Sequence, residues 1–359
     1  MKITRVELKD FMIFESLSVD WSPNINVISG GNSTGKTALI KVMYSLLAAL
    51  FQVVPKPEPR EKTEAKIVDK MTHVFRPENL AIGRLVRRKQ GGNRAEGSIF
   101  LQNLEKAIRF GFGNRAEKRI DLDINGLNIG FLQGAAVYFP PKEIISSIEN
   151  FRSLYEDMHI AFEETYNDLA RYLDRPLKKG ENTSEQQKVI DSLGSIMKGS
   201  IIQKENKFYL SVLGKDEYEM GLVSEGYRKL ATIVYLICNG VLNKRSILFW
   251  DEPEANMNPK MIGPLVEAVM ELAKMGVQVF ITTHDYFIQQ YFNMYMAFPE
   301  TNPSNIDIRF MSLFKNDKSD AINSESASVL SDLEHNTIME EFDEIYNREQ
   351  GIIYDRIRG

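Results

Sequence analysis

The residues best suited to chemistry form one glycine-rich octapeptide. It consists of Gly30, Gly31, Asn32, Ser33, Thr34, Gly35, Lys36 and Thr37, and it matches G-x-x-x-x-G-K-[ST] at every position. Glycines let successive N–H groups point at phosphate oxygens, and a helix that starts near Gly35 adds the positive end of its dipole. Lys36 is predicted to reach the β- and γ-phosphates, and the Thr37 hydroxyl to ligate Mg²⁺. A glycine-rich turn that binds nothing is disfavoured, because the match follows a strand and opens a helix.

Two carboxylates follow an apolar run farther along the chain. Residues 246–250 read Ser-Ile-Leu-Phe-Trp, which favours a buried strand that ends at Asp251 and Glu252. Asp251 is predicted to hold Mg²⁺ through its water shell, and Glu252 to polarise an attacking water. The alternative is a strand that ends in a solvated acidic turn, and a phosphate loop in the same chain makes this alternative the weaker one.

Two weaker motifs lie on either side of these carboxylates. His284 ends the next predicted strand, where its ring could hydrogen-bond a γ-phosphate and sense its presence. Ser224 and Gly226 precede an apolar helix, and the donors at a helix start can bind an anion. The alternatives are a histidine without a function and a plain N-cap. The positions of His284 and of the Ser224–Gly226 segment relative to the acidic strand favour the functional interpretation.

The elements that must position these motifs alternate between helix and strand. The pattern predicts helices over 226–242, 259–275 and 285–293, with strands over 246–250 and 277–282. This alternation indicates a parallel sheet covered by helices. For the rest of the chain, the pattern predicts strands over 3–13 and 25–28, a helix over 36–51, a surface loop over 55–64, short strands within 98–139, helical spacing over 142–173, a helix over 186–197 and a hairpin over 200–212 around Asn206.

Composition narrows the class of protein. The chain has 359 residues, 43% of them apolar, and a formal net charge of −5, which is typical of a globular protein of about two domains. Its single cysteine, Cys238, excludes an intrachain disulfide and a thiolate metal cluster. No apolar run approaches about 18 residues and no signal peptide is visible, so a cytoplasmic protein without membrane contact is expected.

One local cluster of basic residues could contact nucleic acid. It comprises Arg84, Arg87, Arg88, Lys89 and Arg94, with glycines between them and almost no acid nearby in sequence. The alternative is a solvated loop, and the lack of interleaved aromatic residues leaves both interpretations open. The net negative charge argues only against a surface that is basic throughout. Residues 331–349 are acidic.

The order of the motifs resembles that of the ABC-type ATPase heads of the SMC, RecF and OLD group. Residues 251–259, Asp-Glu-Pro-Glu-Ala-Asn-Met-Asn-Pro, are similar to the DEPEANLHP Walker B and D-loop of bacterial AAA-type ATPases in that group, which occur in anti-phage defence operons. Residues 224–229, Ser-Glu-Gly-Tyr-Arg-Lys, resemble their variant of the LSGGQ signature. Residues 6–11 and 24–28 are similar to their first strands. The resemblance covers about residues 1–50, 135–150 and 200–295.

This resemblance implies an α/β fold, an ABC-type ATPase head. Its parts would be an N-terminal β-rich lobe with the Walker A loop (1–140), a helical insertion (141–199), and a C-terminal lobe with a parallel sheet flanked by helices, carrying the signature, Walker B, D-loop and H-loop (200–359). The segment 150–198 would be a docking surface between two ATPase lobes, or a solvated hairpin without a partner. The Q-loop glutamine has no clear counterpart, since Gln133 precedes its strand, and Lys142 or Glu143 is the candidate to replace it.

The resemblance also implies a function. The head would bind ATP and Mg²⁺, hydrolyse ATP slowly and form a homodimer or higher homo-oligomer around it. Ser224 and Gly226 of one subunit would lie against the γ-phosphate held by the other, with Asn256 across the interface. It would control a separate effector protein in anti-phage defence. The alternative is a DNA-binding ATPase of the recombination-mediator (RecF-like) type. A transporter subunit is disfavoured because the signature departs from LSGGQ, and no intrinsic nuclease is expected, because the residues after His284 lack a Glu followed by a paired Asp-x-Asp.

Overall fold

The strands of the protein form three sheets, the largest of which lies at the centre of the molecule. The computed structural model describes residues 2–51, 59–124, 134–149, 151–158, 160–204, 207–212, 216–316, 319 and 321–358. The central sheet has the strand order β14 (Ile322–Ala327), β13 (Ile308–Lys315), β3 (Ile25–Gly30), β12 (Gln278–Thr282), β11 (Ile247–Asp251) and β7 (Ala136–Phe139). Only β14 is antiparallel to its neighbour. The predicted α/β fold is confirmed.

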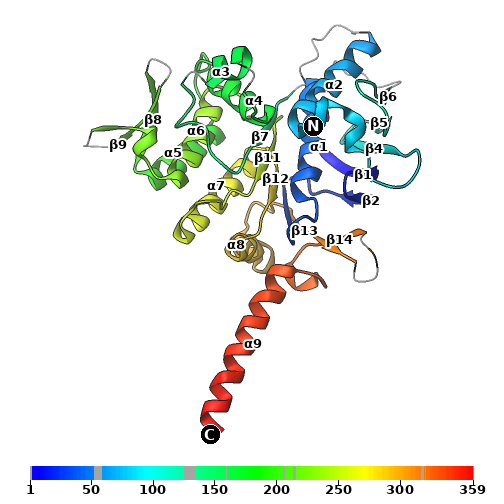
Figure 1. Ribbon diagram of the computed structural model, residues 1–359. Helices are drawn as coiled ribbons and strands as arrows, with labels where there is room; N and C mark the ends of the chain where they lie inside the picture. Colours follow the sequence, from blue (N-terminus) through cyan, green and yellow to red (C-terminus); the bar gives the residue numbers. More distant parts are fainter. Residues whose placement is uncertain are drawn as a thin grey trace.

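The helices surround this sheet (Figure 1). The described α-helices are α1 (Lys36–Phe51), α2 (Arg60–Phe75), α3 (Phe151–Met158), α4 (Glu164–Leu173), α5 (Ser184–Met197), α6 (Glu225–Cys238), α7 (Ile262–Lys274), α8 (Tyr286–Ala297) and α9 (Thr337–Arg358). Short 3₁₀ helices span Glu78–Leu80, Ile82–Leu85, Met220–Leu222, Pro259–Met261, Pro299–Thr301 and Leu330–Asp332. The helical spacing predicted over 142–173 was wrong for residues 142–149, which form bends and turns, and the helical part of the segment is divided between α3 and α4.

Two hydrophobic cores lie on opposite faces of the central sheet. All residues of β11 and β12 are buried, which explains their unbroken apolar runs. Leu248 and Trp250 belong to a core shared with α4 to α8, whereas Phe249 belongs to a core shared with α1 and the N-terminal sheet. Because successive side chains of a strand point to opposite faces, this one strand joins both cores.

The N-terminal sheet is antiparallel and packs on the α1 side of the central sheet. Its strand order is β2 (Phe14–Asp20), β1 (Ile3–Phe11), β4 (Arg94–Leu101), β5 (Ile108–Gly113) and β6 (Asp121–Asp123). The strand predicted over 3–13 ends at Phe11, and a tight turn then leads into β2. The loop predicted over 55–64 was wrong from residue 60 onward, because α2 begins there. Its residues 55–58 lie outside the described part of the chain.

The predicted hairpin over 200–212 is confirmed as part of a small third sheet. This sheet has the order β10 (Glu217–Glu219), β9 (Lys207–Val212), β8 (Gly199–Lys204), and Asn206 lies outside the described residues. The segment 150–198 contributes Leu169, Leu173, Val189, Leu193 and Met197 to the same core as β11 and α6. It is therefore packed onto the parallel sheet. Its boundaries and its role as a docking surface stay predictions.

Helix α9 extends away from the body (Figure 1). Its first turns pack against the rest of the molecule. The rings of Phe342 and Tyr286 stack with centroids 4.5 Å apart, and Gln290 on α8 lies 3.4 Å from the sulfur of Met339. The helix therefore leaves the body beside the start of α8.

Candidate nucleotide site

The octapeptide forms a tight loop between β3 and α1. The backbone at Gly30 has φ +146°, and a Cβ there would lie 2.2 Å from the carbonyl oxygen of Leu313. At Gly35, φ is +95° and a Cβ would lie 2.6 Å from the ring of Phe14. Both positions therefore require glycine. Ser33 between them has φ +62°, so the loop turns sharply before α1 begins at Lys36.

The loop offers donors that suit an anion. Among the residues that the structure describes, no backbone carbonyl accepts the N–H groups of Asn32, Ser33 or Gly35. The buried Lys36 ammonium donates to the carbonyl oxygens of Gly30 (2.8 Å) and Gly31 (3.0 Å), and burial lowers its pKa to about 8. A desolvated cation beside free amides favours the binding of a phosphate group.

Asp251 is the polar centre of the site. The hydroxyl groups of Thr37, Tyr138 and Thr282 donate to its carboxylate at 3.0, 2.9 and 2.5 Å. The three hydroxyl groups come from α1, β7 and β12, and Asp251 ends β11, which lies between these two strands. The predicted pair of magnesium ligands, Thr37 and Asp251, therefore meets in space although 214 residues separate the two. Hydroxyl and carboxylate oxygens are ligands that Mg²⁺ prefers.

Two of the hydroxyl groups that donate to Asp251, those of Thr282 and Tyr138, were not predicted from the sequence. Thr282 was visible as the single hydroxyl at the end of the apolar strand that precedes His284. Tyr138 offered no signal, because a tyrosine within an apolar strand is usually part of the core. Burial, and then the charge of Asp251, raises the pKa of Tyr138 well above 10. The phenol therefore stays protonated and donates to the carboxylate.

Glu252 and His284 face each other at the ends of β11 and β12. Glu252 has φ +46°, and its N–H donates to the carbonyl oxygen of Thr282 at 3.1 Å. Its carboxylate lies 3.5 Å from His284 Nε2. Burial, followed by the positive charge of Lys36, lowers the pKa of His284. The ring is therefore neutral at pH 7, with one nitrogen available to donate and one to accept.

A third carboxylate, Glu254, holds the histidine segment in place. Its Oε1 accepts from the Thr283 hydroxyl (2.7 Å) and from the His284 N–H (2.8 Å). Within the described residues its buried Oε2 has no hydrogen-bond partner. Burial raises the pKa of Glu254 to about 7. No separate role was predicted for this residue from the sequence.

The raised pKa of Glu254 predicts a pH dependence of stability. Folding raises this pKa from 4.5 to about 7, so the stabilising contribution is full below pH 4.5 and is lost as the pH rises to about 7. Between pH 5 and pH 8 the loss is about 2 to 3 kcal/mol. Glu254→Gln has no proton to lose and keeps an acceptor, so its free energy of unfolding should fall less over this range. Urea unfolding at both pH values measures the difference, and equal losses in the two proteins would contradict this prediction.

The signature segment forms the start of α6 at the surface. Ser224 is the exposed N-cap of α6, and its side chain makes no capping hydrogen bond. Gly226 is buried, and a Cβ there would lie 3.5 Å from Met257 and Met261, which is an ordinary contact. Lys229 donates to the carbonyl oxygens of the loop after β11, at Pro253 (2.9 Å) and Ala255 (2.7 Å). The helix start is therefore fixed to the acidic loop, with the N-cap hydroxyl left exposed.

The segment after β7 contacts the same helix. Glu143 is buried, and its carboxylate accepts from Arg228 on α6 and from the Ser146 hydroxyl. Of the two residues predicted to replace the Q-loop glutamine, Glu143 is thus the one joined to the signature helix by this ion pair. Its role stays a prediction, and Gln133 lies outside the described residues.

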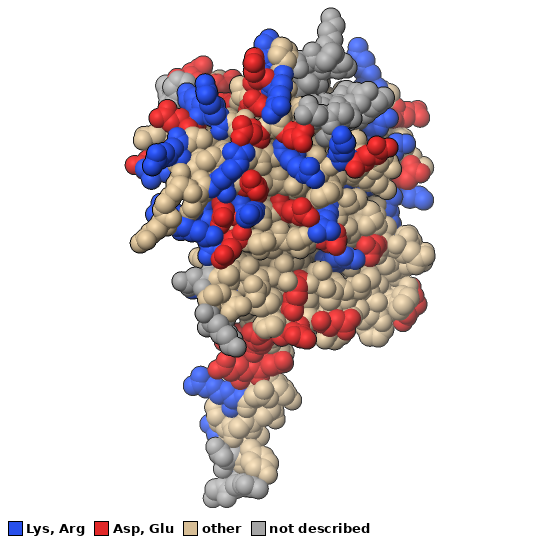
Figure 2. Space-filling model, turned by 90° about the vertical axis from the view of Figure 1, so that its right-hand side faces the viewer, with Lys and Arg blue, Asp and Glu red and all other residues tan. Residues whose placement is uncertain are grey.

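The basic cluster is not a patch of one charge. Carboxylates from other segments neutralise most of it: Arg84 pairs with Glu78, Arg87 with Glu15, Lys89 with Asp10, and Arg94 with Asp121, at 2.5 to 2.8 Å. Figure 2 shows acidic and basic side chains interspersed on this side of the molecule. Residues 84–94 contain no acid in the sequence, but the pairing of β1, β2, β4, β5 and β6 brings carboxylates of other segments to them.

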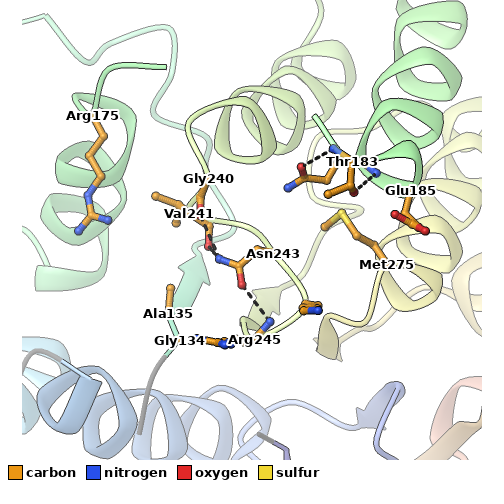
Figure 3. A pocket seen from close by; sticks show the side chains of 12 residues that line it. Gly134, Ala135, Arg175, Thr183, Glu185, Gly240, Val241, Asn243, Arg245 and Met275 are labelled. Carbon is orange, nitrogen blue, oxygen red and sulfur yellow. Dashed lines mark hydrogen bonds between the residues drawn. The ribbon is translucent and has the colours of Figure 1, made fainter. Parts of the chain in front are cut away.

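A separate pocket of about 710 Å³ lies at the opposite ends of the strands (Figure 3). Its lining includes Ala135, Arg245 and Met275, which directly precede or closely approach the starts of β7, β11 and β12. Asn243 occupies it, donating to the carbonyl oxygen of Gly240 (3.0 Å) and accepting from the Arg245 N–H (2.9 Å). These polar groups therefore already bond within the chain, and the pocket is distinct from the loop at Lys36.

None of the described helices is both long enough and apolar enough to cross a membrane.

Parts of the chain are similar to an AAA domain family and to RecF proteins. The family described as "AAA domain, putative AbiEii toxin, Type IV TA system" matches residues 135–288, which contain the signature, the acidic strand and His284. The DNA replication and repair protein RecF of Staphylococcus epidermidis is 23% identical over 255 residues, which are 70% of this chain and 60% of that protein. RecF of Halalkalibacterium halodurans is 45% identical over 49 residues, 14% of this chain and 13% of that protein. The chain thus spans less than two thirds of these relatives.

Solved structures share the architecture. A crystal structure of an Smc head bound to the C-winged helix domain of ScpA aligns with a TM-score of 0.57 at 14% identity, over 92% of this chain and 99% of that one. The Smc head from Pyrococcus furiosus, with an extended coiled coil and bound to the C-terminal domain of ScpA, aligns with a TM-score of 0.53 at 14% identity, over 96% and 99%. The chain therefore has the fold of an SMC ATPase head. Residues 135–288 are similar to the AAA domain family, and the chain is similar to RecF proteins in sequence.

Proposed function

We propose that this protein binds ATP with Mg²⁺ and hydrolyses it slowly. The observation that carries the proposal is the contact of 3.0 Å between the Thr37 hydroxyl and the Asp251 carboxylate beside a loop of free amides. These groups fit a nucleoside triphosphate and its metal ion. When bound, Mg²⁺ would neutralise charge on the β- and γ-phosphates.

Each side chain of the site has a role in this proposal. Lys36 binds the β- and γ-phosphate oxygens through its ammonium group, and Thr37 and Asp251 hold the metal ion. Glu252 accepts the proton of the attacking water, since its carboxylate lies at the open end of β11. His284 donates a hydrogen bond to the γ-phosphate from the adjacent strand end. Tyr138 and Thr282 orient Asp251.

Lys36→Ala is expected to weaken ATP binding roughly 30- to 160-fold. Loss of one charge-assisted contact of about 2 to 3 kcal/mol gives this factor. Calorimetric titration with ATP measures the affinity. Lys62→Ala, on the exposed side of α2, is the matched control and should bind as the wild type does. An unchanged affinity in Lys36→Ala would remove the Walker A assignment.

The proposal extends to a homodimer that encloses ATP and controls a separate effector. Ser224 is exposed at the start of α6, so its hydroxyl and the first amides of the helix are accessible to a second head. The matching family's description names a toxin and a Type IV TA system, which supports a setting in bacterial defence. In this setting the ATP-bound dimer would control the activity of a separate effector protein, because the only reaction proposed for this chain is ATP hydrolysis.

The second candidate function is a DNA-binding ATPase. It is favoured by the similarity, over 70% of this chain, to RecF of Staphylococcus epidermidis, which is described as a DNA replication and repair protein. The ion pairs of Arg87 and Lys89 with Glu15 and Asp10 weigh against the basic cluster as the contact surface. A DNA-binding role would therefore need another surface.

DNA binding across a salt series tests whether the basic cluster contacts DNA. We expect Arg87→Glu combined with Arg88→Glu to leave both the DNA affinity and its salt dependence as in the wild type. If these arginines do contact phosphates, the slope of log affinity against log salt should decrease by about one for each lost contact. A decrease of that size would favour the DNA-binding alternative.

A further inference from the structure

Three side chains with metal-binding groups meet between β14 and the start of α9 (Figure 1). They are Glu325 on β14, and Glu334 and His335 in the segment that leads into α9. One carboxylate oxygen from each glutamate and one ring nitrogen of the histidine lie within 4.8 Å of one another. In the described part of the chain, no other three histidine, cysteine, aspartate or glutamate side chains come this close together, and none of these three residues belongs to the candidate nucleotide site.

The distance between two of these groups fits a shared ion better than a direct hydrogen bond. Nδ1 of His335 lies 3.5 Å from Oε2 of Glu325. A direct N–H···O bond usually spans about 2.7 to 3.2 Å. Two nitrogen or oxygen ligands of a tetrahedral zinc ion, each about 2.0 to 2.2 Å from the metal, lie about 3.3 to 3.5 Å apart. This pair therefore already has the separation of two zinc ligands, and the exposed side chain of Glu334 can rotate its carboxylate onto the same ion.

The imidazole of His335 is held in place with its ring nitrogens accessible. Its ring stacks on that of Phe314 in β13, with centroids 4.0 Å apart and planes inclined by 2°. Stacking covers a face of the ring, whereas the nitrogen lone pair that binds a metal lies in the ring plane. The backbone N–H of His335 donates to Oε1 of Glu325 at 2.6 Å, which leaves Oε2 to face Nδ1. The fold therefore fixes two ligands before any ion binds.

The charges of this cluster favour a cation, and its donor types select the kind. Over the residues that the structure describes, neither Glu325 nor Glu334 pairs with a lysine or arginine, and the one partner of Glu325 is His335. Two carboxylates this close repel each other unless a cation lies between them. Mg²⁺ and Ca²⁺ bind sets of about six or more oxygen ligands, whereas an imidazole nitrogen suits zinc and its neighbours among the transition metals.

We propose that Glu325, Glu334 and His335 bind one divalent transition-metal ion, Zn²⁺ being the ion that these donors fit best. Three protein ligands leave a fourth position for water. Glu325 belongs to a strand of the central sheet, and α9 begins at Thr337, two residues after His335. The ion would therefore fasten the base of α9 to the sheet. This site does not require nucleotide and stands apart from the proposed ATP chemistry.

Calorimetric titration with Zn²⁺ tests the ligands in the full, untagged chain without nucleotide. In a Cys238→Ser background, one ion should bind per chain. His335→Phe keeps a ring to stack on Phe314 but has no ring nitrogen, and Glu325→Gln loses the carboxylate. Loss of an outer-shell partner typically weakens metal binding about 10- to 100-fold, so either loss of a ligand should weaken it at least as much. His73→Phe is the matched control, because His73 lies 3.3 Å from Asp69 without a third ligand, and it should bind Zn²⁺ as the wild type does.

Hydrogen exchange tests whether the ion fastens the base of α9. Zn²⁺ should slow amide exchange over residues 330–340 in the wild type and not in His335→Phe, and Mg²⁺ at the same concentration should leave exchange there unchanged. A wild type that binds no Zn²⁺, or equal protection in both proteins, would overturn the proposal. So would Zn²⁺ binding that is lost in Glu252→Gln and kept in Glu325→Gln, since the ion would then lie at the candidate nucleotide site.

Discussion

Glu252→Gln is expected to bind ATP as tightly as the wild type while turning it over about 10²- to 10⁴-fold more slowly. The amide keeps the shape of the side chain at the end of β11, 3.5 Å from His284, but it cannot accept a proton from the attacking water. An ATP-bound dimer should therefore accumulate. Light scattering detects the dimer, and a phosphate-release assay measures the turnover.

A matched variant separates this effect from a general loss of charge. Glu267→Gln removes a carboxylate from the exposed side of α7 and should turn over ATP at the wild-type rate. Calorimetric titration of both variants verifies that nucleotide binding is intact. Wild-type turnover in Glu252→Gln would assign the general base to another residue.

A carboxylate placed at the start of α6 is expected to abolish ATP-driven dimerisation and hydrolysis and to leave the affinity of a single head for ATP nearly unchanged. In the proposed dimer the start of α6 faces the γ-phosphate held by the other head, so the negative charge that Gly226→Asp adds there would repel the phosphate. Gly226→Ala is the control, since its Cβ makes only ordinary contacts at 3.5 Å with Met257 and Met261. Ser224→Glu makes the same test at an exposed position, where folding is not at risk.

Mixing two inactive variants gives the sharper result. Each heterodimer of Gly226→Asp with Lys36→Ala keeps one composite site in which both halves are intact. Half of the randomly mixed dimers are heterodimers with one of two sites, so about a quarter of the wild-type rate should return. Normal hydrolysis by Gly226→Asp alone would show instead that this chain acts as a single head.

The positions of the candidate site residues could be predicted because strand ends determine them. The carboxyl ends of neighbouring parallel strands meet at one edge of the sheet, so Thr37, Asp251 and His284 converge whatever the connecting segments do. The hydrogen-bond partners of Asp251 were harder to predict. Tyr138 lies in a fully buried strand, and nothing local separates a phenol that donates to a carboxylate from one that fills the core.

Two helices, α9 and α2, were missed because charged residues precede or surround their apolar positions in the sequence. In α9, acids and arginines surround the apolar residues, so the segment was visible only as an acidic one. In α2, Pro59 precedes a helix whose buried positions, including Ile67 and Met71, come only after several charged residues. The ion pairs of the basic cluster were invisible for a third reason. Their partners Asp10 and Glu15 lie more than 70 residues away and arrive only through strand pairing.

The place at which α9 leaves the body has a spectroscopic consequence. Phe342 stacks on Tyr286, which lies two residues beyond His284 in the chain. A movement of the segment at His284 would therefore change the surroundings of the Tyr286 ring. A tryptophan in place of Phe342 would report such a movement as a change in its fluorescence.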